Sequence, residues 1–265
     1  MKGITDAIKH LIIINVLFFI ATAMFKDQMF HLFSLWFPKN ENFGLWQIVS
    51  HMFMHGGLMH ILFNMYGLYA FGTPLERIWG RNKFFFFFFS AGIGAALIHT
   101  GVNYYHVQQG LEAINSWLPD SIYYEMLNVN SIAGNQMYRE LFFENAVNLL
   151  NSNGIQHKIS SSNFETLYKA HESFKTPVVG ASGAVYGVLV AFAFLYSEAE
   201  LMLIFLPIPI KAKYFVPLLL LSDVFFGFSN INTGTAHFAH LGGALIGFIM
   251  MWYWKKNQFN DKRWN

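Results

Sequence analysis

One serine in this chain stands where a hydroxyl group is unexpected. The stretch PVVGASGAVYGVLVAFAFLY, from Pro177 to Tyr196, carries no charge, and Ser182 lies in it between Gly180 and Gly183. Because about 20 apolar residues cross the hydrocarbon of a bilayer, this stretch predicts a membrane-spanning helix. The serine either belongs to a small-residue face for helix packing or is a nucleophile. A nucleophile requires a base and an oxyanion site elsewhere in the chain.

Two other apolar stretches supply both groups. His240 lies in the run AHFAHLGGALIG, and an imidazole hydrogen-bonded to Ser182 can accept its proton at neutral pH. His60 and Asn64 are four residues apart, so they share one face of a helix. Their side chains can donate hydrogen bonds to an oxyanion beside the backbone N–H of Ser182. These residues predict a nucleophile, a base and oxyanion donors.

Glycines would allow the two halves of this site to meet. Gly183 and Gly187 lie on the stretch that holds the serine, and Gly243 and Gly247 lie on the stretch that holds His240. Helices with small residues on facing sides can approach closely in a membrane. We therefore expect these two helices to pack directly against each other.

An orienting carboxylate is missing from this predicted set. Asp223 is the only carboxylate within the late apolar stretches. We expect it to make a contact at a helix end or in a loop rather than to touch His240. His237 is expected to lie at the end of a loop and not to act as a second base.

Histidines four residues apart also suggest a metal site. His51 and His55, or His60 with a partner, could bind zinc. No carboxylate or thiolate joins them, however, and a metal site would leave the serine and its glycines unexplained. No metal and no other cofactor is therefore expected.

The composition indicates a polytopic membrane protein. The chain has 265 residues, of which 54% are hydrophobic, 18% aromatic and only 12% charged. Soluble domains carry about 25% charged residues. The formal net charge of +2 is too small to suggest a nucleic-acid partner, and cysteine is absent, which excludes disulfides and thiolate metal sites. The expected surroundings are a lipid bilayer.

Hydropathy predicts about six membrane spans. They are Leu11 to Phe25, Leu58 to Gly72, Phe84 to Tyr105, Pro177 to Tyr196, Tyr214 to Phe228, and Ala236 to Trp254. The apolar segment from Leu201 to Ile210 is broken by Pro207 and Pro209, which favours a position at the membrane interface over another span.

Lysine and arginine predict the orientation of these spans. With the N-terminus inside, the inside segments hold eleven of these residues and the outside segments six. Both termini are therefore expected in the cytoplasm. The expected location is the inner (plasma) membrane of a bacterium. The first apolar run lacks a small-residue cleavage pattern, so we interpret it as a retained helix and not as a signal peptide.

The segment from His106 to Thr176 differs in composition from its flanks. Met137 to Leu150 places apolar residues at helical spacing, and Ser162 with Glu165 has the spacing of a capping box. We predict an amphipathic helical insertion on the outer membrane surface, and a partly ordered linker is the alternative. The expected fold is all-α: a single membrane domain over residues 1–265, with residues 106–176 as an extracytoplasmic insertion between its third and fourth helices.

Three segments together resemble the rhomboid family of intramembrane serine proteases. They are HGGLMHILFNMYGLYAFGTPLERIWG, GASGAVYG and AHFAHLGGALIG, in the order and on the spans that the family pattern requires. The resemblance implies Ser182 as nucleophile and His240 as general base, a dyad without an acid. It also implies His60 and Asn64 as the oxyanion hole.

Further roles follow only from this resemblance. It implies Gly180 as the glycine that lets the chain bend beside the nucleophile, and Tyr186 as the ring that stacks on the catalytic histidine. Trp46 matches a tryptophan of the first loop. Gln47 follows it where many relatives carry arginine, so the hydrogen bonding of this loop is expected to differ.

The expected function is therefore an intramembrane serine endopeptidase that cleaves client membrane proteins in or near a transmembrane segment. A client helix must unwind locally to offer its backbone, which favours small residues at the cleavage point and helix-weakening Gly or Pro nearby. Because the family also contains relatives without the dyad, the alternative is a proteolytically inactive rhomboid-like protein that binds membrane clients.

Overall fold

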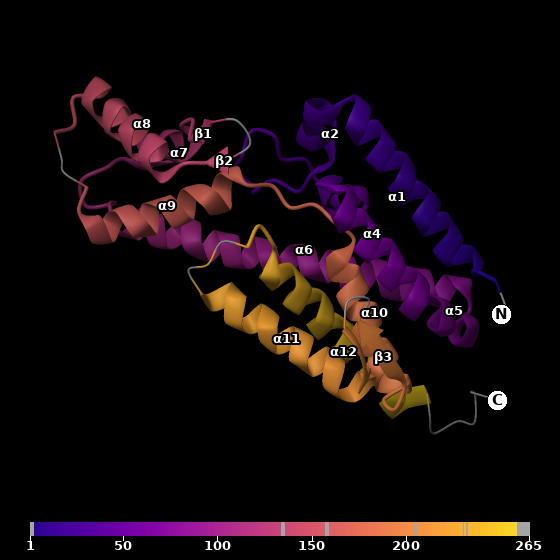
Figure 1. Ribbon diagram of the computed structural model, residues 1–265. Helices are drawn as coiled ribbons and strands as arrows, with labels where there is room; N and C mark the ends of the chain where they lie inside the picture. The colour runs from indigo at the N-terminus through magenta and orange to yellow at the C-terminus, as the bar shows by residue number, and fades with distance from the viewer. Residues whose placement is uncertain are drawn as a thin grey trace. The chain divides into compact units, whose positions relative to one another are not determined.

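The computed structural model describes residues 3–133, 136–156, 159–203, 206–229, 231 and 233–258 (Figure 1). Its contacts divide the chain into two compact units. Unit 1 comprises Met1–Leu35, Gly44–His99 and Val178–Asn265, and unit 2 comprises Trp36–Phe43 and Thr100–Pro177.

Unit 1 is built mainly from helices. Its elements are α1 (Asp6–Met24), α2 (Lys26–Phe33), α3 (Gln47–Ser50), η1 (His51–Phe53), α4 (Leu58–Gly67), the π-helical turn η2 (Leu68–Gly72), α5 (Thr73–Trp79), the first part of α6 (Arg81–Glu112), α10 (Ser182–Leu195), α11 (Ala212–Phe228) and α12 (His237–Gln258). Each of the six apolar stretches forms a helix over most of its length, as the sequence predicts.

Not every apolar helix of the chain is long enough to cross a membrane by itself. Within the described residues, α1 and α6 are long and apolar enough to cross a bilayer, and α10 is apolar but has 14 residues. The predicted count of six spans therefore stays a prediction.

The fourth predicted helix begins later than its apolar stretch. Pro177 to Ala181 are not helical, and Val178 forms a β-bridge with Leu35, each backbone N–H lying 2.9 Å from the other residue's carbonyl oxygen. Gly180 has a φ of +125°, which an α-helix does not allow. The helix consequently starts at Ser182.

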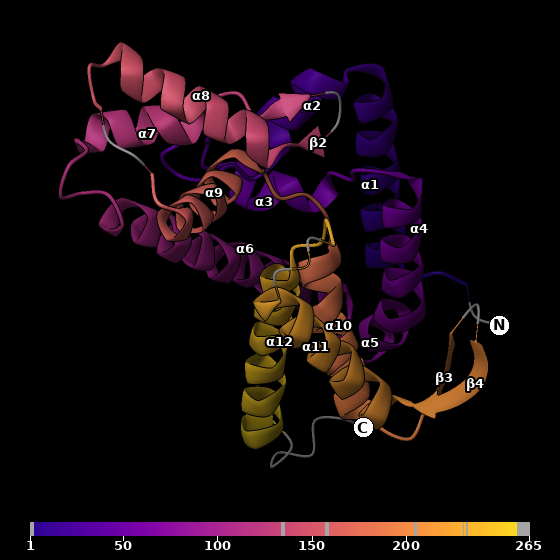
Figure 2. The same ribbon diagram turned by 60° about the vertical axis from the view of Figure 1, so that its left-hand side comes forward.

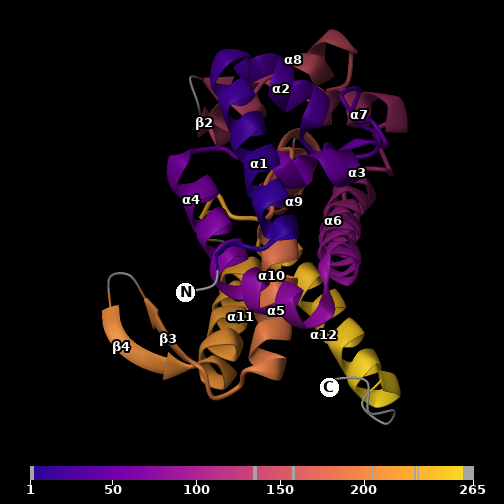
Figure 3. The same ribbon diagram turned by 90° about the vertical axis from the view of Figure 1, so that its right-hand side faces the viewer.

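Two short antiparallel hairpins correct the all-α expectation to a mostly helical fold. They pair β1 (Ile132–Ala133) with β2 (Gln136–Met137), and β3 (Glu200–Leu203) with β4 (Leu206–Lys211). The segment expected at the membrane interface therefore forms the β3–β4 hairpin, which projects away from α10 and α11 (Figures 2 and 3). Pro207 and Pro209 fit there because β4 pairs on one side only, and an edge strand tolerates a missing N–H.

Glycines bring α10 and α12 into direct contact, and Figure 2 shows the two helices side by side. A Cβ atom on Gly243 would lie only 1.8 Å from the carbonyl oxygen of Gly183. One on Gly187 would lie 3.0 Å from the carbonyl oxygen of Gly243, and one on Gly247 would lie 2.7 Å from the Cα of Gly187. The predicted glycine-mediated approach of these helices is confirmed.

Two side chains anchor helix ends in unit 1. The buried carboxylate of Glu76, on α5, accepts hydrogen bonds from the backbone N–H groups of Ala7 (2.8 Å) and Ile8 (3.1 Å), which would otherwise be unpaired at the start of α1. Gln47 is fully buried, and its Nε2 donates to the carbonyl oxygens of His31 (3.2 Å) and Leu32 (3.3 Å) at the end of α2. An uncharged amide thus binds the first loop at this position.

Unit 2 has an apolar core of its own. It contains the second part of α6, α7 (Asp120–Asn128), the β1–β2 hairpin, α8 (Arg139–Ser152) and α9 (Ser161–Lys175). Phe142, Tyr123 and Leu167 are fully buried among these helices. The linker alternative is therefore wrong for the described residues, and the expected helix over Met137 to Leu150 corresponds to α8. The capping residue of α9 is Ser160 rather than Ser162, since its Oγ accepts from the N–H of Asn163 (3.2 Å).

A buried histidine links three parts of unit 2. His171 is fully buried, and its Nδ1 lies 2.9 Å from the carbonyl oxygen of Leu127 and its Nε2 2.6 Å from the hydroxyl of Ser131. The ring stacks on Phe142 at 4.4 Å. The carbonyl oxygen can only accept, so Nδ1 carries a proton and donates to it. Burial lowers the pKa of His171 to about 4. The ring is therefore neutral at neutral pH, and Nε2 accepts from the Ser131 hydroxyl.

We expect acid to destabilise unit 2 through His171. The unfolded chain binds a proton on this histidine at about pH 6.5, whereas the folded chain resists protonation down to about pH 4. Stability is therefore fully present above pH 6.5 and falls as the pH drops towards 4, by up to roughly 3 kcal/mol. Limited proteolysis of the intact protein at a series of pH values measures this loss. His171→Gln should flatten the pH dependence, and an equally steep profile in that variant would assign it to other groups.

The glycine contact predicts a sharp stability difference between two similar substitutions. Gly243→Ala should lower the free energy of unfolding by about 1–3 kcal/mol, because its methyl group meets the backbone of Gly183. Gly101→Ala, on α6, places its methyl group in open space and should be neutral or slightly stabilising. Thermal unfolding in detergent micelles, followed by circular dichroism, compares the two. Equal midpoints would show that α10 and α12 do not need this close approach.

Candidate functional site

Ser182 is the first residue of α10. Its position is set by Gly180, whose N–H donates to the carbonyl oxygen of His51 (2.9 Å) and whose φ of +125° turns the chain into the helix. A Cβ atom on Gly180 would lie 2.7 Å from Nε2 of His60. The backbone bend and the close approach both require glycine, which confirms the bend that the resemblance implies.

The predicted nucleophile and base are in contact. Nε2 of His240 lies 2.9 Å from Oγ of Ser182. His240 is buried on α12, and its ring stacks nearly parallel on Tyr186, with 4.1 Å between the ring centres. The stacking that the resemblance implies is therefore confirmed. This arrangement allows the imidazole to remove the hydroxyl proton.

The prediction that Asp223 makes a contact at a helix end or in a loop, and not with His240, is wrong. Asp223 lies inside α11, only 3% exposed, and not at a helix end. Its Oδ1 is 3.1 Å from Nδ1 of His240 and 2.6 Å from Nδ1 of His237. The sequence did contain a signal for this contact, since a lone carboxylate in an apolar helix is costly unless it has partners. The histidines one helix further along the chain are those partners.

His237 is the first residue of α12 and contacts two polar groups. Besides Asp223, it reaches the Thr233 hydroxyl, which lies 2.7 Å from Nε2. This places it where a loop meets a helix, as expected.

His60 and Asn64 lie one turn apart on α4. A Cβ atom added to Gly180 would lie 2.7 Å from Nε2 of His60 and 3.6 Å from Oγ of Ser182. The His60 ring and the serine hydroxyl therefore border the same small space beside Gly180. Asn64 is 5% exposed, and its Nδ2 has no hydrogen-bond partner among the described residues. A buried amide donor without a partner is costly, and it suits a group that forms its hydrogen bond only when an oxyanion develops.

The histidines considered for zinc are used differently. Nδ1 of His51 lies 2.8 Å from the carbonyl oxygen of Gln47, four residues earlier in the chain. His55 and His60 pack edge to face, with 4.9 Å between ring centres. Among the described residues, the set able to ligate a cation together is instead Asp223, His237 and His240, whose ligand atoms lie within 4.8 Å of one another.

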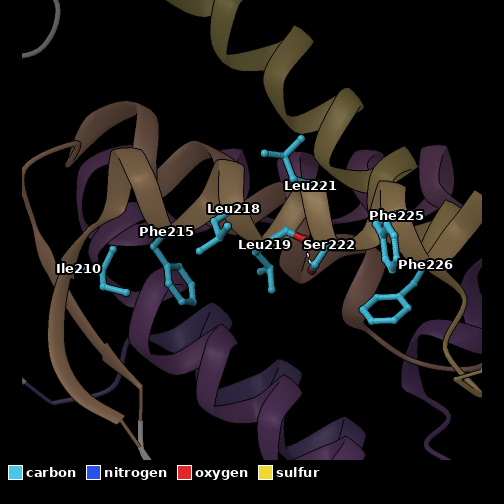
Figure 4. Close-up of a pocket in the computed structure, with 8 residues that line it drawn as sticks. All are labelled: Ile210, Phe215, Leu218, Leu219, Leu221, Ser222, Phe225 and Phe226. Atoms are coloured by element: carbon cyan, nitrogen blue, oxygen red, sulfur yellow. Dashed lines mark hydrogen bonds between the residues drawn. The ribbon is translucent and has the colours of Figure 1, made fainter.

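A cavity of about 460 Å³ lies along α11 and is separate from these residues (Figure 4). It is lined by Ile210, Phe215, Leu218, Leu219, Leu221, Ser222, Phe225 and Phe226. The Ser222 hydroxyl, its polar side-chain group, donates to the carbonyl oxygen of Leu219 at 2.7 Å. The lining therefore suits apolar groups and not the reaction chemistry.

A mostly helical chain with apolar helices, in which a partly exposed serine contacts a buried histidine, is typical of a helical membrane protein with a hydrolase-type site. Residues 42–111 and 128–257 match the Rhomboid domain. The chain belongs to the rhomboid family, whose members are integral membrane proteins and generally intramembrane serine proteases.

Curated relatives come from mitochondria and from bacteria. The chain is 23% identical over 212 residues to Rhomboid protein 1, mitochondrial, of Saccharomyces cerevisiae. The matched residues are 79% of this chain and 42% of that protein. The chain is 22% identical over 262 residues to RHOMBOID-like protein 12, mitochondrial, of Arabidopsis thaliana. The matched residues are 98% of this chain and 62% of that protein. The chain is 36% identical over 69 residues to Rhomboid protease GlpG of Salmonella newport. The matched residues are 26% of this chain and 25% of that protein. The chain thus spans less than two thirds of the length of each of these relatives.

Proposed function

We propose that this protein is a serine endopeptidase that cleaves transmembrane segments of client membrane proteins. The observation that carries the proposal is the 2.9 Å contact between Nε2 of His240 and Oγ of Ser182 at the start of α10. Membership of the rhomboid family supports it.

The residues divide the reaction between them. His240 accepts the hydroxyl proton as Oγ of Ser182 attacks the client's carbonyl carbon, and the carbonyl oxygen becomes an oxyanion. Asn64, His60 and the backbone N–H of Ser182 donate hydrogen bonds to that oxygen. His240 then protonates the leaving amine, the peptide C–N bond breaks, and water hydrolyses the acyl-enzyme by the same steps.

The proposed substrates are membrane proteins whose transmembrane helix is locally weak. A regular helix keeps its carbonyl groups hydrogen-bonded, so a client with Gly or Pro near a small residue offers its backbone more readily. The proposed location is a bacterial inner membrane. The lysine and arginine distribution supports an orientation with both termini in the cytoplasm.

Labelling with a fluorophosphonate probe tests the proposal without a known client. The purified protein in detergent should be labelled, and Ser182→Ala and His240→Ala should each abolish labelling while thermal unfolding stays close to that of the wild type. Ser222→Ala is the matched control, since its hydroxyl is bonded within α11 and should not matter. Folded wild-type protein that resists labelling would instead favour the inactive, client-binding alternative.

The oxyanion role of Asn64 makes a separate prediction. Asn64→Ala should slow cleavage of a transmembrane reporter by about 10- to 1000-fold, because one donor to the oxyanion is lost. Asn15→Ala serves as control, since that buried amide donates to its own helix at Leu11 (2.7 Å). If both variants cleave at the wild-type rate, Asn64 takes no part in the mechanism.

A further inference from the structure

We propose that Asp223 is a positioning residue that extends the serine–histidine pair to a Ser182–His240–Asp223 triad. The inference rests on the proposed function. It departs from the dyad without an acid that the resemblance implies, and the geometry of α11 and α12 carries it.

The hydrogen bonds of Asp223 determine which nitrogen of His240 carries the proton. An ionised carboxylate accepts hydrogen bonds and donates none. Nδ1 of His240, 3.1 Å from Oδ1, must therefore carry the proton. Nε2 is then free to accept from the Ser182 hydroxyl at 2.9 Å. This is the tautomer that a general base for Ser182 requires.

The same contacts restrain the imidazole ring. Asp223 contacts one nitrogen, Ser182 contacts the other, and Tyr186 stacks on the ring face at 4.1 Å. Tyr186 also interacts with the carboxylate. A ring held at both nitrogens and on one face loses little freedom when the reaction begins.

The carboxylate is itself held in place. His237 approaches Oδ1 to 2.6 Å from the start of α12. Its other nitrogen reaches the Thr233 hydroxyl at 2.7 Å. Asp223 is the only acidic residue in α10, α11 and α12 and is 3% exposed. A carboxylate in such an apolar helix is costly, and its partners are the two imidazoles.

Kinetics with a transmembrane reporter test the role. Asp223→Asn preserves shape but removes the charge, and we expect kcat to fall about 100-fold or more with KM nearly unchanged. Asp223→Glu should restore part of kcat. Ser222→Ala, one residue away on the same helix, should leave both constants unchanged. Wild-type kcat in Asp223→Asn, or a change in KM alone, would overturn the proposal.

A spectroscopic measurement separates positioning from mere stability. In protein labelled with ¹⁵N-histidine, the signals lost in His240→Ala identify that ring. We expect the Nδ1-protonated tautomer in the wild type and its loss in Asp223→Asn at unchanged thermal stability. The same tautomer in both proteins would overturn the proposal.

Two controls distinguish the other failures. If wild-type protein is not labelled by the fluorophosphonate probe, the proposed function fails. If it is labelled and Asp223→Asn is labelled at the same rate, only the triad fails. Activity that disappears with a chelator and returns with Zn²⁺ would make Asp223, His237 and His240 a metal site and overturn the positioning role.

Discussion

The glycine-mediated contact between α10 and α12 is the constraint on which the site depends. Helices in a membrane gain little from excluding apolar surface, so close packing and hydrogen bonds must hold them together. With Gly183, Gly187 and Gly243 at the contact, backbone meets backbone and the N-terminal ends of both helices lie side by side. Only at this separation can an imidazole on α12 reach a hydroxyl on α10, and any larger residue at the contact would move them apart.

The polar side chains at this end of unit 1 form one connected series. Hydrogen bonds link Thr233 to His237, His237 to Asp223, Asp223 to His240, and His240 to Ser182. Each side chain contacts the next, and these contacts offset the cost of placing the buried members, Asp223 and His240, in an apolar bundle. The side chains of this series come from α10, α11 and α12, and from Thr233 in the loop before α12. Its geometry therefore depends on three helices at once.

Unit 2 follows a different principle. Its helices bury aromatic and aliphatic side chains against one another, and a neutral histidine–serine pair lies in their core without access to solvent. Ser131 and His171 make the same kind of hydroxyl–imidazole contact as Ser182 and His240, but in a core closed to solvent. Ser182 differs from Ser131 because it is partly exposed, lies two residues after Gly180, whose φ is +125°, and contacts a histidine that also contacts the carboxylate of Asp223.

The sequence by itself determined the helical stretches, the serine, its histidine and the glycines between them, because spacing along a helix decides which residues share a face. Only the tertiary structure decided the partner of Asp223, the start of α10 at Ser182 and the separate core of unit 2. The physical reason is the same in each case. A hydrogen bond between α11 and α12, a bridge from Leu35 to Val178, or a shared core joins residues far apart in the chain, and no local pattern encodes that distance.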